Sequence, residues 1–132
     1  MTAQRRNRLT THPIVHVEIP ATDLKEATQF YADVFEWEID HSMEDYPMFK
    51  AEGGPAGGFV KLSDPAHSVG VPLLFLGTDD IEATLATIEA HGGKTLMPKT
   101  EIGENAQHGW WAVFSDPVGN RLALYTSPHQ VS

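Results

Sequence analysis

The sequence predicts an α+β fold built from two similar β-α-β-β-β modules. The main observation is an internal repeat: residues 22–28, TDLKEAT, return 56 residues later as TDDIEAT, with five of seven positions identical. Each copy follows an apolar run typical of a strand and opens a segment with the spacing of an amphipathic helix. A half of roughly sixty residues is too small to bury a core alone, so we expect the two to share one domain.

The first module begins with a strand over residues 14–20. Strict alternation puts Val15, Val17 and Ile19 on one face of this strand and His16 and Glu18 on the other. The apolar spacing of residues 24–35 predicts a helix that covers the apolar face, with Asp23 as its N-cap. Three short strands are expected at 37–41, 48–51 and 58–62, the last of them after a glycine-rich segment, 53–58.

The second module repeats this order. We expect a strand over residues 71–76 and a helix over 80–90, with Asp79 as its N-cap and a stop at Gly92 and Gly93. Strands follow at 94–102, 109–115 and 121–126, and the sequence DPVGN at 116–120 predicts a turn between the last two. With one helix on a single face of each sheet, two curved sheets side by side would form a mixed-sheet cup with the helices on its outer face.

The domain boundaries follow from composition. Residues 1–12 are polar and contain an arginine cluster, which indicates a disordered arm. A single domain is expected over residues 13–127, with modules at 13–63 and 70–127. The polar, proline-bearing residues 63–68 are the expected linker between them.

Composition excludes several classes of function. The chain of 132 residues has no cysteine, which excludes a disulfide framework, a thiolate zinc site and a cysteine nucleophile. Its 18 acidic and 9 basic residues give a formal net charge of −9, which opposes binding to nucleic acid or to an anionic membrane. No apolar run approaches the ~20 residues of a membrane span. We therefore predict a cytoplasmic protein with neither partner, and exposed sheet edges predict a homodimer.

Three motifs together resemble the vicinal oxygen chelate superfamily, whose members include glyoxalase I, extradiol dioxygenases, and fosfomycin- and bleomycin-resistance proteins. The motifs are Thr-Asp-x-x-x-Ala at the start of each helix, Phe-Tyr-x-x-x-Phe-x-Trp at residues 30–37, and Phe-x-Asp-Pro-x-Gly-Asn at residues 114–120. The resemblance runs from about residue 13 to 127, is nearest to the branch related to lactoylglutathione lyase, and implies the tandem-module fold. One departure is Glu36, which stands where a small glycine is usual.

The resemblance also implies where a metal would bind. Metal-dependent members take one ligand from the first and one from the last strand of each module. Those positions correspond here to His16, Lys61, Pro72 or Leu73, and Ala123. Only His16 is a suitable donor, and a stable site needs at least three. We therefore expect no metal site, no other cofactor and no lactoylglutathione lyase activity.

The candidate site residues are those whose strand parity would turn them into the cup. We expect His16 and Glu18 to be the catalytic pair if a reaction occurs. The expected ligand-binding residues are Phe59, Lys61, Trp111, Arg121 and Tyr125, under lids drawn from residues 53–58 and 103–109. Trp110 and Trp111 are neighbours on one strand, so they must face opposite sides. The alternative for His16 is a structural hydrogen bond to Glu18 or to a neighbouring strand.

Three functions remain open. The first, which we favour, is a metal-free protein that binds a small organic molecule in the cup, as bleomycin-resistance proteins do, with a cationic ligand favoured by the acidic net charge. The second is a lyase or isomerase that uses His16 and Glu18 with an atypical metal or none. The third is an interaction protein whose cup is vestigial.

Overall fold

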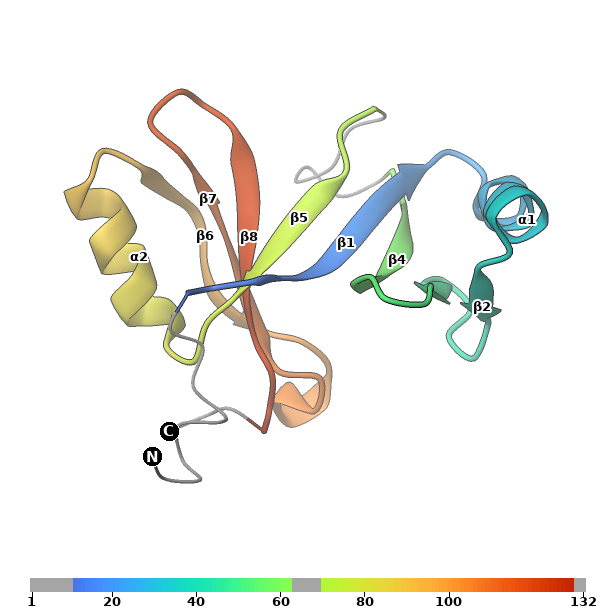
Figure 1. Ribbon diagram of the computed structural model, residues 1–132. Coiled ribbons are helices and arrows are strands. Elements are labelled where there is room, and N and C mark those ends of the chain that lie inside the picture. Colours follow the sequence, from blue (N-terminus) through green and yellow to red (C-terminus); the bar gives the residue numbers. More distant parts are fainter. Residues whose placement is uncertain (1–10, 63–69, 130–132) are drawn as a thin grey trace. The chain divides into compact units, whose positions relative to one another are not determined.

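The computed structural model describes residues 11–62 and 70–129 (Figure 1). Within these residues the chain forms eight strands and two α-helices in the order of two β-α-β-β-β modules, which confirms the α+β class. Residues 1–10 of the expected arm and the expected linker at 63–68 lie outside the described residues. The chain divides into two compact units: residues 15–74 form one, and residues from 75 onward form the other together with the segment that ends at Ile14.

The first unit contains β1 (Ile14–Ala21), α1 (Leu24–Phe35), β2 (Glu38–Asp40), β3 (Met48–Lys50) and β4 (Ala56–Lys61). Its strands lie in the order β2-β3-β4-β1. The β2–β3 and β3–β4 pairs are antiparallel, whereas β4 pairs with β1 in parallel. The first and last strands of this module are therefore direct neighbours, although a helix and two strands separate them in the sequence.

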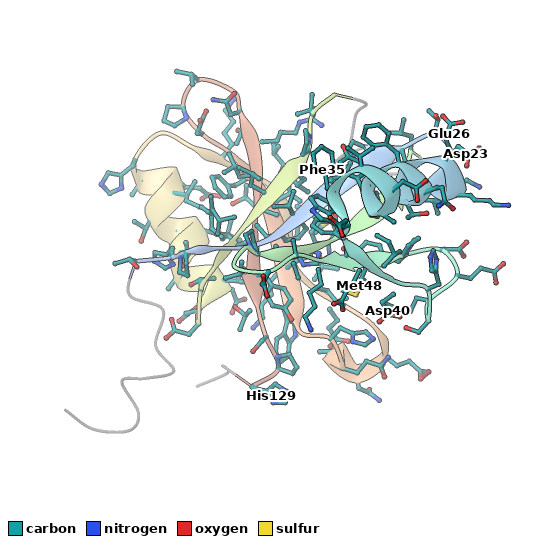
Figure 2. The ribbon with its side chains drawn as sticks, turned by 45° about the vertical axis from the view of Figure 1, so that its right-hand side comes forward. Asp23, Glu26, Phe35, Asp40, Met48 and His129 are labelled. Carbon is teal, nitrogen blue, oxygen red and sulfur yellow. The ribbon has the colours of Figure 1, made fainter. Side chains whose placement is uncertain are left out.

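Helix α1 begins and ends at residues with clear capping roles. The Asp23 carboxylate accepts a hydrogen bond from the Glu26 backbone N–H at 3.0 Å, as expected of an N-cap. Figure 2 labels Asp23 and Glu26 at this end of the helix and Phe35 at the other. The C-cap is Glu36, in the left-handed conformation (φ 58°, ψ 32°), and its N–H bonds to the Ala32 carbonyl. Glu36 thus adopts the conformation for which glycine is usual.

An aromatic cluster forms the core between α1 and its sheet. Tyr31 stacks on Trp37 with ring centroids 4.8 Å apart, and Trp37 stacks on Phe49 at 4.3 Å. Phe59 of β4 is fully buried, and its ring lies 5.6 Å from that of Tyr31. These contacts place the Phe59 side chain on the α1 face of the sheet.

The second unit contains β5 (Leu73–Gly77) from Phe75 onward, α2 (Ile81–Ala90), β6 (Lys94–Glu101), a short 3-10 helix η2 (Glu104–Ala106), β7 (Trp110–Ser115) and β8 (Arg121–Thr126). Its strands lie in the order β5-β8-β7-β6. β5 pairs with β8 in parallel, and β8–β7 and β7–β6 are antiparallel. Its pairing pattern therefore repeats that of the first module.

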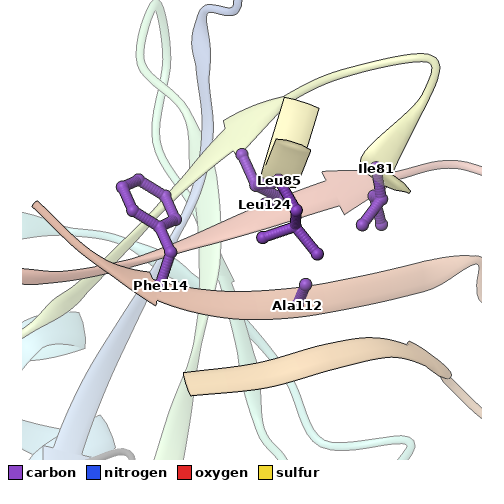
Figure 3. Close-up of a cluster of buried hydrophobic side chains, with 5 residues drawn as sticks. All are labelled: Ile81, Leu85, Ala112, Phe114 and Leu124. Carbon is purple, nitrogen blue, oxygen red and sulfur yellow. The ribbon is translucent and has the colours of Figure 1, made fainter. Parts of the chain in front are cut away.

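A second apolar core lies between α2 and its sheet, as Figure 3 shows. Ile81 and Leu85 of α2 pack against Ala112 and Phe114 of β7 and Leu124 of β8. All five are buried, and Ala112 and Leu124 are at most 1% exposed. Helix α2 therefore covers this face of the sheet.

The N-cap of α2 corrects one prediction. Asp80, not Asp79, accepts the hydrogen bond of the first turn, from the Ala83 N–H at 3.0 Å. The reason lies in the preceding threonine: the Thr78 hydroxyl accepts from the Asp80 N–H and contacts the Thr84 hydroxyl at 2.9 Å. The helix starts 57 residues after α1, so the structural repeat is displaced by one residue from the sequence repeat.

Strand bounds near glycine also differ from the prediction. β4 starts at Ala56, so Gly57 and Gly58 belong to the strand and not to the expected lid at 53–58. The second expected lid, at 103–109, contains η2, where Asn105 and Ala106 have positive φ values of 53° and 55°.

A cup formed by the two modules together stays a prediction. Neither helix in the described part of the chain is long and apolar enough to span a membrane.

Candidate functional site

The first sheet has one face covered by α1 and one face that carries polar groups. Because β1 and β4 pair in parallel with Ile19 opposite Phe59, both of these residues face α1. His16 and Glu18 have the opposite parity in β1 and therefore lie on the face away from α1, as predicted. Both are half-buried.

A tyrosine outside the strands joins these two side chains. The Tyr46 hydroxyl donates to Glu18 Oε2 at 2.6 Å, and His16 Nε2 lies 2.7 Å from the same hydroxyl. The His16 and Tyr46 rings are nearly parallel, with an interplanar angle of 19°. We call these three residues, His16, Tyr46 and Glu18, the polar array. Tyr46 was not among the predicted site residues, because the composition of residues 45–47 is typical of a turn between strands.

Gly58 makes room for the Tyr46 ring. A Cβ atom at Gly58 would lie 2.2 Å from Tyr46 Cζ and 2.4 Å from its hydroxyl oxygen, far inside van der Waals contact. Gly58 stands opposite Glu18 in the β1–β4 register. A glycine opposite an inward polar residue was therefore the one sequence signal that a side chain from elsewhere fills this position.

Burial and charge adjust the acid–base properties of the array. Burial lowers the pKa of His16, and the nearby Glu18 charge partly opposes this change. Burial also raises the pKa of Tyr46 far above its usual range, with further contributions from the Glu18 charge and hydrogen bond. At neutral pH the array therefore holds a neutral imidazole and a neutral phenol.

The register corrects the placement of Phe59 and Lys61. Both were expected on the same face as His16, but they stand opposite Ile19 and Ala21 of β1, whose side chains lie on the α1 face. Phe59 is part of the aromatic core, and Lys61 is exposed. The physical reason is the parallel β1–β4 pairing, which puts Ala56 and Gly58 beside His16 and Glu18.

The second sheet has its own face away from α2. Trp111 stands opposite Tyr125 in the β7–β8 register, and alternation puts Arg121 on the same face of β8. The Trp111 ring stacks on Phe75, with centroids 5.8 Å apart, and the Tyr125 hydroxyl donates to the His108 carbonyl at 2.9 Å. The predicted parity of Trp111, Arg121 and Tyr125 is correct, and Trp110 packs on the α2 side. Their role in binding a ligand stays a prediction.

The residues present do not fit the metal centre that the resemblance implies. On β4, Ala56 and Gly58 lie beside His16 and Glu18, and on β8 the corresponding position is the fully buried Ala123. None of the three has a donor side chain. In residues 11–62 and 70–129, no three His, Cys, Asp or Glu side chains gather closely enough to hold a metal ion.

Known proteins resemble this chain in sequence and in fold. The family model of the Glyoxalase/Bleomycin resistance protein/Dioxygenase superfamily matches residues 13–124. A glyoxylase-like domain-containing protein of Didymella fabae is 29% identical over 120 residues, which cover 85% of this chain and 91% of that protein. A Mycobacterium bovis protein that carries the glyoxylase name is 24% identical over 87% of the chain, which spans only 46% of that protein's length.

Solved structures show the same fold at low sequence identity. The methylmalonyl-CoA epimerase of Mycobacterium tuberculosis superposes with a TM-score of 0.68 at 17% identity, over 93% of this chain and 95% of that one. A superfamily member from Vibrio splendidus gives a TM-score of 0.63 at 15% identity, over 89% of this chain and 100% of the other.

Proposed function

This chain belongs to the Glyoxalase/Bleomycin resistance protein/Dioxygenase superfamily, and from that membership and the polar array we propose that it binds a small organic molecule without the metal centre of its metal-dependent relatives. The single observation that carries the proposal is the array itself. His16, Tyr46 and Glu18 meet on the sheet face that α1 does not cover. A small number of polar groups held close together in fixed positions is typical of ligand sites.

The array offers a ligand hydrogen-bonding groups in fixed positions. Tyr46 is held from both sides, by contacts of 2.6 and 2.7 Å, and its ring fills the space above Gly58. Groups held in this way lose little conformational entropy when a ligand binds. The formal net charge of −9 favours a cationic ligand over an anionic one.

Chemical-shift mapping tests this proposal with a set of small-molecule probes. Mixtures of small aromatic amines, neutral aromatics and aromatic acids would be added to ¹⁵N-labelled protein, and amide shifts recorded. We expect the shifted amides to gather on β1, β4 and residues 42–47, with amines binding more tightly than acids. Tyr46→Ala should weaken these shifts, whereas Tyr31→Phe, in the aromatic core, should not.

Two results would count against the proposal. Shifts that gather on other surfaces would place the ligand site elsewhere. No saturable shifts across the whole mixture set would favour the remaining alternative, an interaction protein whose small-molecule site is vestigial.

A second candidate function is a lyase or isomerase reaction that uses His16 and Glu18. The observation in its favour is that the array contains two groups that hold and release protons, bridged by a hydroxyl. The structural neighbour named methylmalonyl-CoA epimerase supplies a first test substrate. Incorporation of deuterium from D₂O into methylmalonyl-CoA, lost in His16→Ala and Glu18→Gln, would support this function, and no incorporation would remove that substrate.

We further propose that the protein is a cytoplasmic homodimer. Contact through strand edges is disfavoured, because β2 has only three residues and β6 has register shifts, Pro98 and two lysines, all of which oppose edge pairing. The exposed sheet edges from which the sequence predicts a homodimer therefore do not supply its contact, and a dimer would use other surfaces. Sedimentation velocity at micromolar concentration tests this, and a single 14.5 kDa species would reject it.

A further inference from the structure

We propose that Tyr46 is a positioning residue that joins His16 and Glu18 into one relay, along which a proton can pass from the imidazole ring to the carboxylate. Tyr46 is outside the motifs that carry the family resemblance. The inference rests on the proposed function for its use by a ligand, but the relay can be measured in the protein alone.

The proton count of the array determines the direction of its hydrogen bonds. A phenol has one proton, and at 2.6 Å that proton is donated to Glu18 Oε2. The Tyr46 oxygen must then accept from His16 Nε2, which lies 2.7 Å away. Before any proton passes along the array, His16 therefore carries a hydrogen on Nε2, in its neutral as well as in its charged form.

The surroundings keep the bridge in place. Gly58 leaves the space that the Tyr46 ring occupies, and the neighbouring Pro47 is buried. Loss of the phenol proton to solvent is strongly disfavoured, because burial raises the pKa of Tyr46. Tyr46 can therefore pass a proton on only as it receives another. The other charged residues that the register assigns to this sheet face are Glu38, Asp40 and Lys50, and all three are exposed.

The relay step conserves atoms and charge. When a ligand gives a proton to His16 Nδ1, a new Nδ1–H bond forms, and the Nε2–H bond breaks as a new O–H bond forms on Tyr46. The original Tyr46 O–H bond breaks in the same step, and its proton bonds to Glu18 Oε2. His16 ends neutral with its hydrogen on Nδ1, Tyr46 again carries one proton, and Glu18 is protonated. The array thus takes up one proton without leaving a charge on the half-buried ring, which burial disfavours.

A double-mutant cycle read by NMR tests the relay. The wild type, Tyr46→Phe, Glu18→Gln and the double variant would be compared by the ring ¹H–¹⁵N correlations of His16 across a pH titration. We expect a single Nε2–H tautomer in the wild type. Glu18→Gln should lower the His16 pKa further, and this effect should be smaller when residue 46 is phenylalanine, because the bridge is gone.

The control is Tyr31→Phe, which removes a phenol from the same module. No hydrogen bond of the Tyr31 hydroxyl is found in the described part of the chain, so His16 should titrate as in the wild type. Amide spectra and melting curves would establish that each variant folds. If Tyr46→Phe does not fold, 3-fluorotyrosine at position 46 makes the hydroxyl more acidic without removing it, and the His16 ring signals must then shift.

Three results would overturn the relay. The first is an Nδ1–H tautomer of His16 in the wild type, and the second is an equal effect of Glu18→Gln on the His16 pKa with and without Tyr46→Phe. The third is that the His16 ring signals do not shift when 3-fluorotyrosine replaces Tyr46. Each is independent of ligand binding. Fragments that still bind on the β1–β4 face would then show that the proposed function holds and that only the role of Tyr46 is wrong.

Discussion

Gly58→Ala is the substitution that most directly tests the position of Tyr46. The added Cβ would lie 2.2 Å from Tyr46 Cζ, 2.4 Å from its hydroxyl oxygen and 2.6 Å from Cε2. Ordinary carbon contacts lie at about 3.5 Å, so the ring must move by roughly 1.3 Å. A shift of that size takes hydrogen bonds of 2.6 and 2.7 Å beyond the usual range.

The expected cost has two parts. Overpacking of a well-filled site costs about 1–3 kcal/mol, and loss of a hydrogen bond to a charged group costs about 1.5–3 kcal/mol. Alanine restricts the unfolded chain more than glycine does, which returns about 0.4–1 kcal/mol. We therefore expect Gly58→Ala to lower the free energy of unfolding by about 1.5–5.5 kcal/mol.

Urea denaturation, with the cycle completed by Tyr46→Ala, measures this effect. Once the ring is absent, Gly58→Ala should cost much less, which gives a coupling energy of about 1–3 kcal/mol. Gly54→Ala is the matched control, because no atom lies within 4 Å of its added Cβ. If Gly58→Ala is as stable as Gly54→Ala, or if the two effects simply add, Tyr46 does not occupy this position.

Four further outcomes can be measured. Glu36→Gly should raise the free energy of unfolding by about 1 kcal/mol, since a left-handed backbone is costly for any residue with a Cβ; a loss of stability would contradict the observed helix end. Phe59→Ala should lower it by about 3–5 kcal/mol, because Phe59 is fully buried, and a cost below 1 kcal/mol would remove it from the core. The pKa of Asp116 is lowered by hydrogen bonds from the Asn120 side chain and backbone, so its contribution is present above the unfolded value of 3.8 and is lost as the pH falls. Asp116→Asn should therefore flatten the acid dependence of stability, and identical acid slopes would speak against these bonds. Added zinc, nickel or manganese should not produce turnover of the methylglyoxal–glutathione adduct, and robust turnover would show that the ligand positions were assigned wrongly.

The sequence predicts the order of elements well because the repeat and the helix spacing are local signals. The bounds of α1 and β8 agree with the prediction to the residue. The parity of His16 and Glu18 was readable because β1 alternates strictly. β4 reads Ala-Gly-Gly-Phe-Val-Lys, in which two glycines leave no alternation to read. The pairing with β1, which is a long-range contact, determines which side chains of β4 lie on which face of the sheet. Phe59 and Lys61 were therefore assigned to the wrong face.

Tyr46 shows the same limit in the candidate site. It is 28 residues from Glu18 and 30 from His16, and nothing near it in the sequence signals those contacts.

For the N-cap of α2, the sequence offers two adjacent aspartates, Asp79 and Asp80. There the hydroxyl of Thr78, which contacts the hydroxyl of Thr84 six residues later, decides in favour of Asp80.

The parallel pairing of the first and last strand in each module has a consequence for how the protein is made. The parallel pair β1–β4 cannot form until β4 has been made, and the parallel pair β5–β8 cannot form until β8 has been made. Such distant pairings slow folding, because the intervening chain loses entropy before any contact stabilises it. On the ribosome, the first sheet cannot close until Lys61 has emerged, whereas the second cannot close until Thr126 has emerged. A chain cut short after Ser115 would therefore leave β5 and β7 without the strand that lies between them, and quality control would meet an exposed half-sheet.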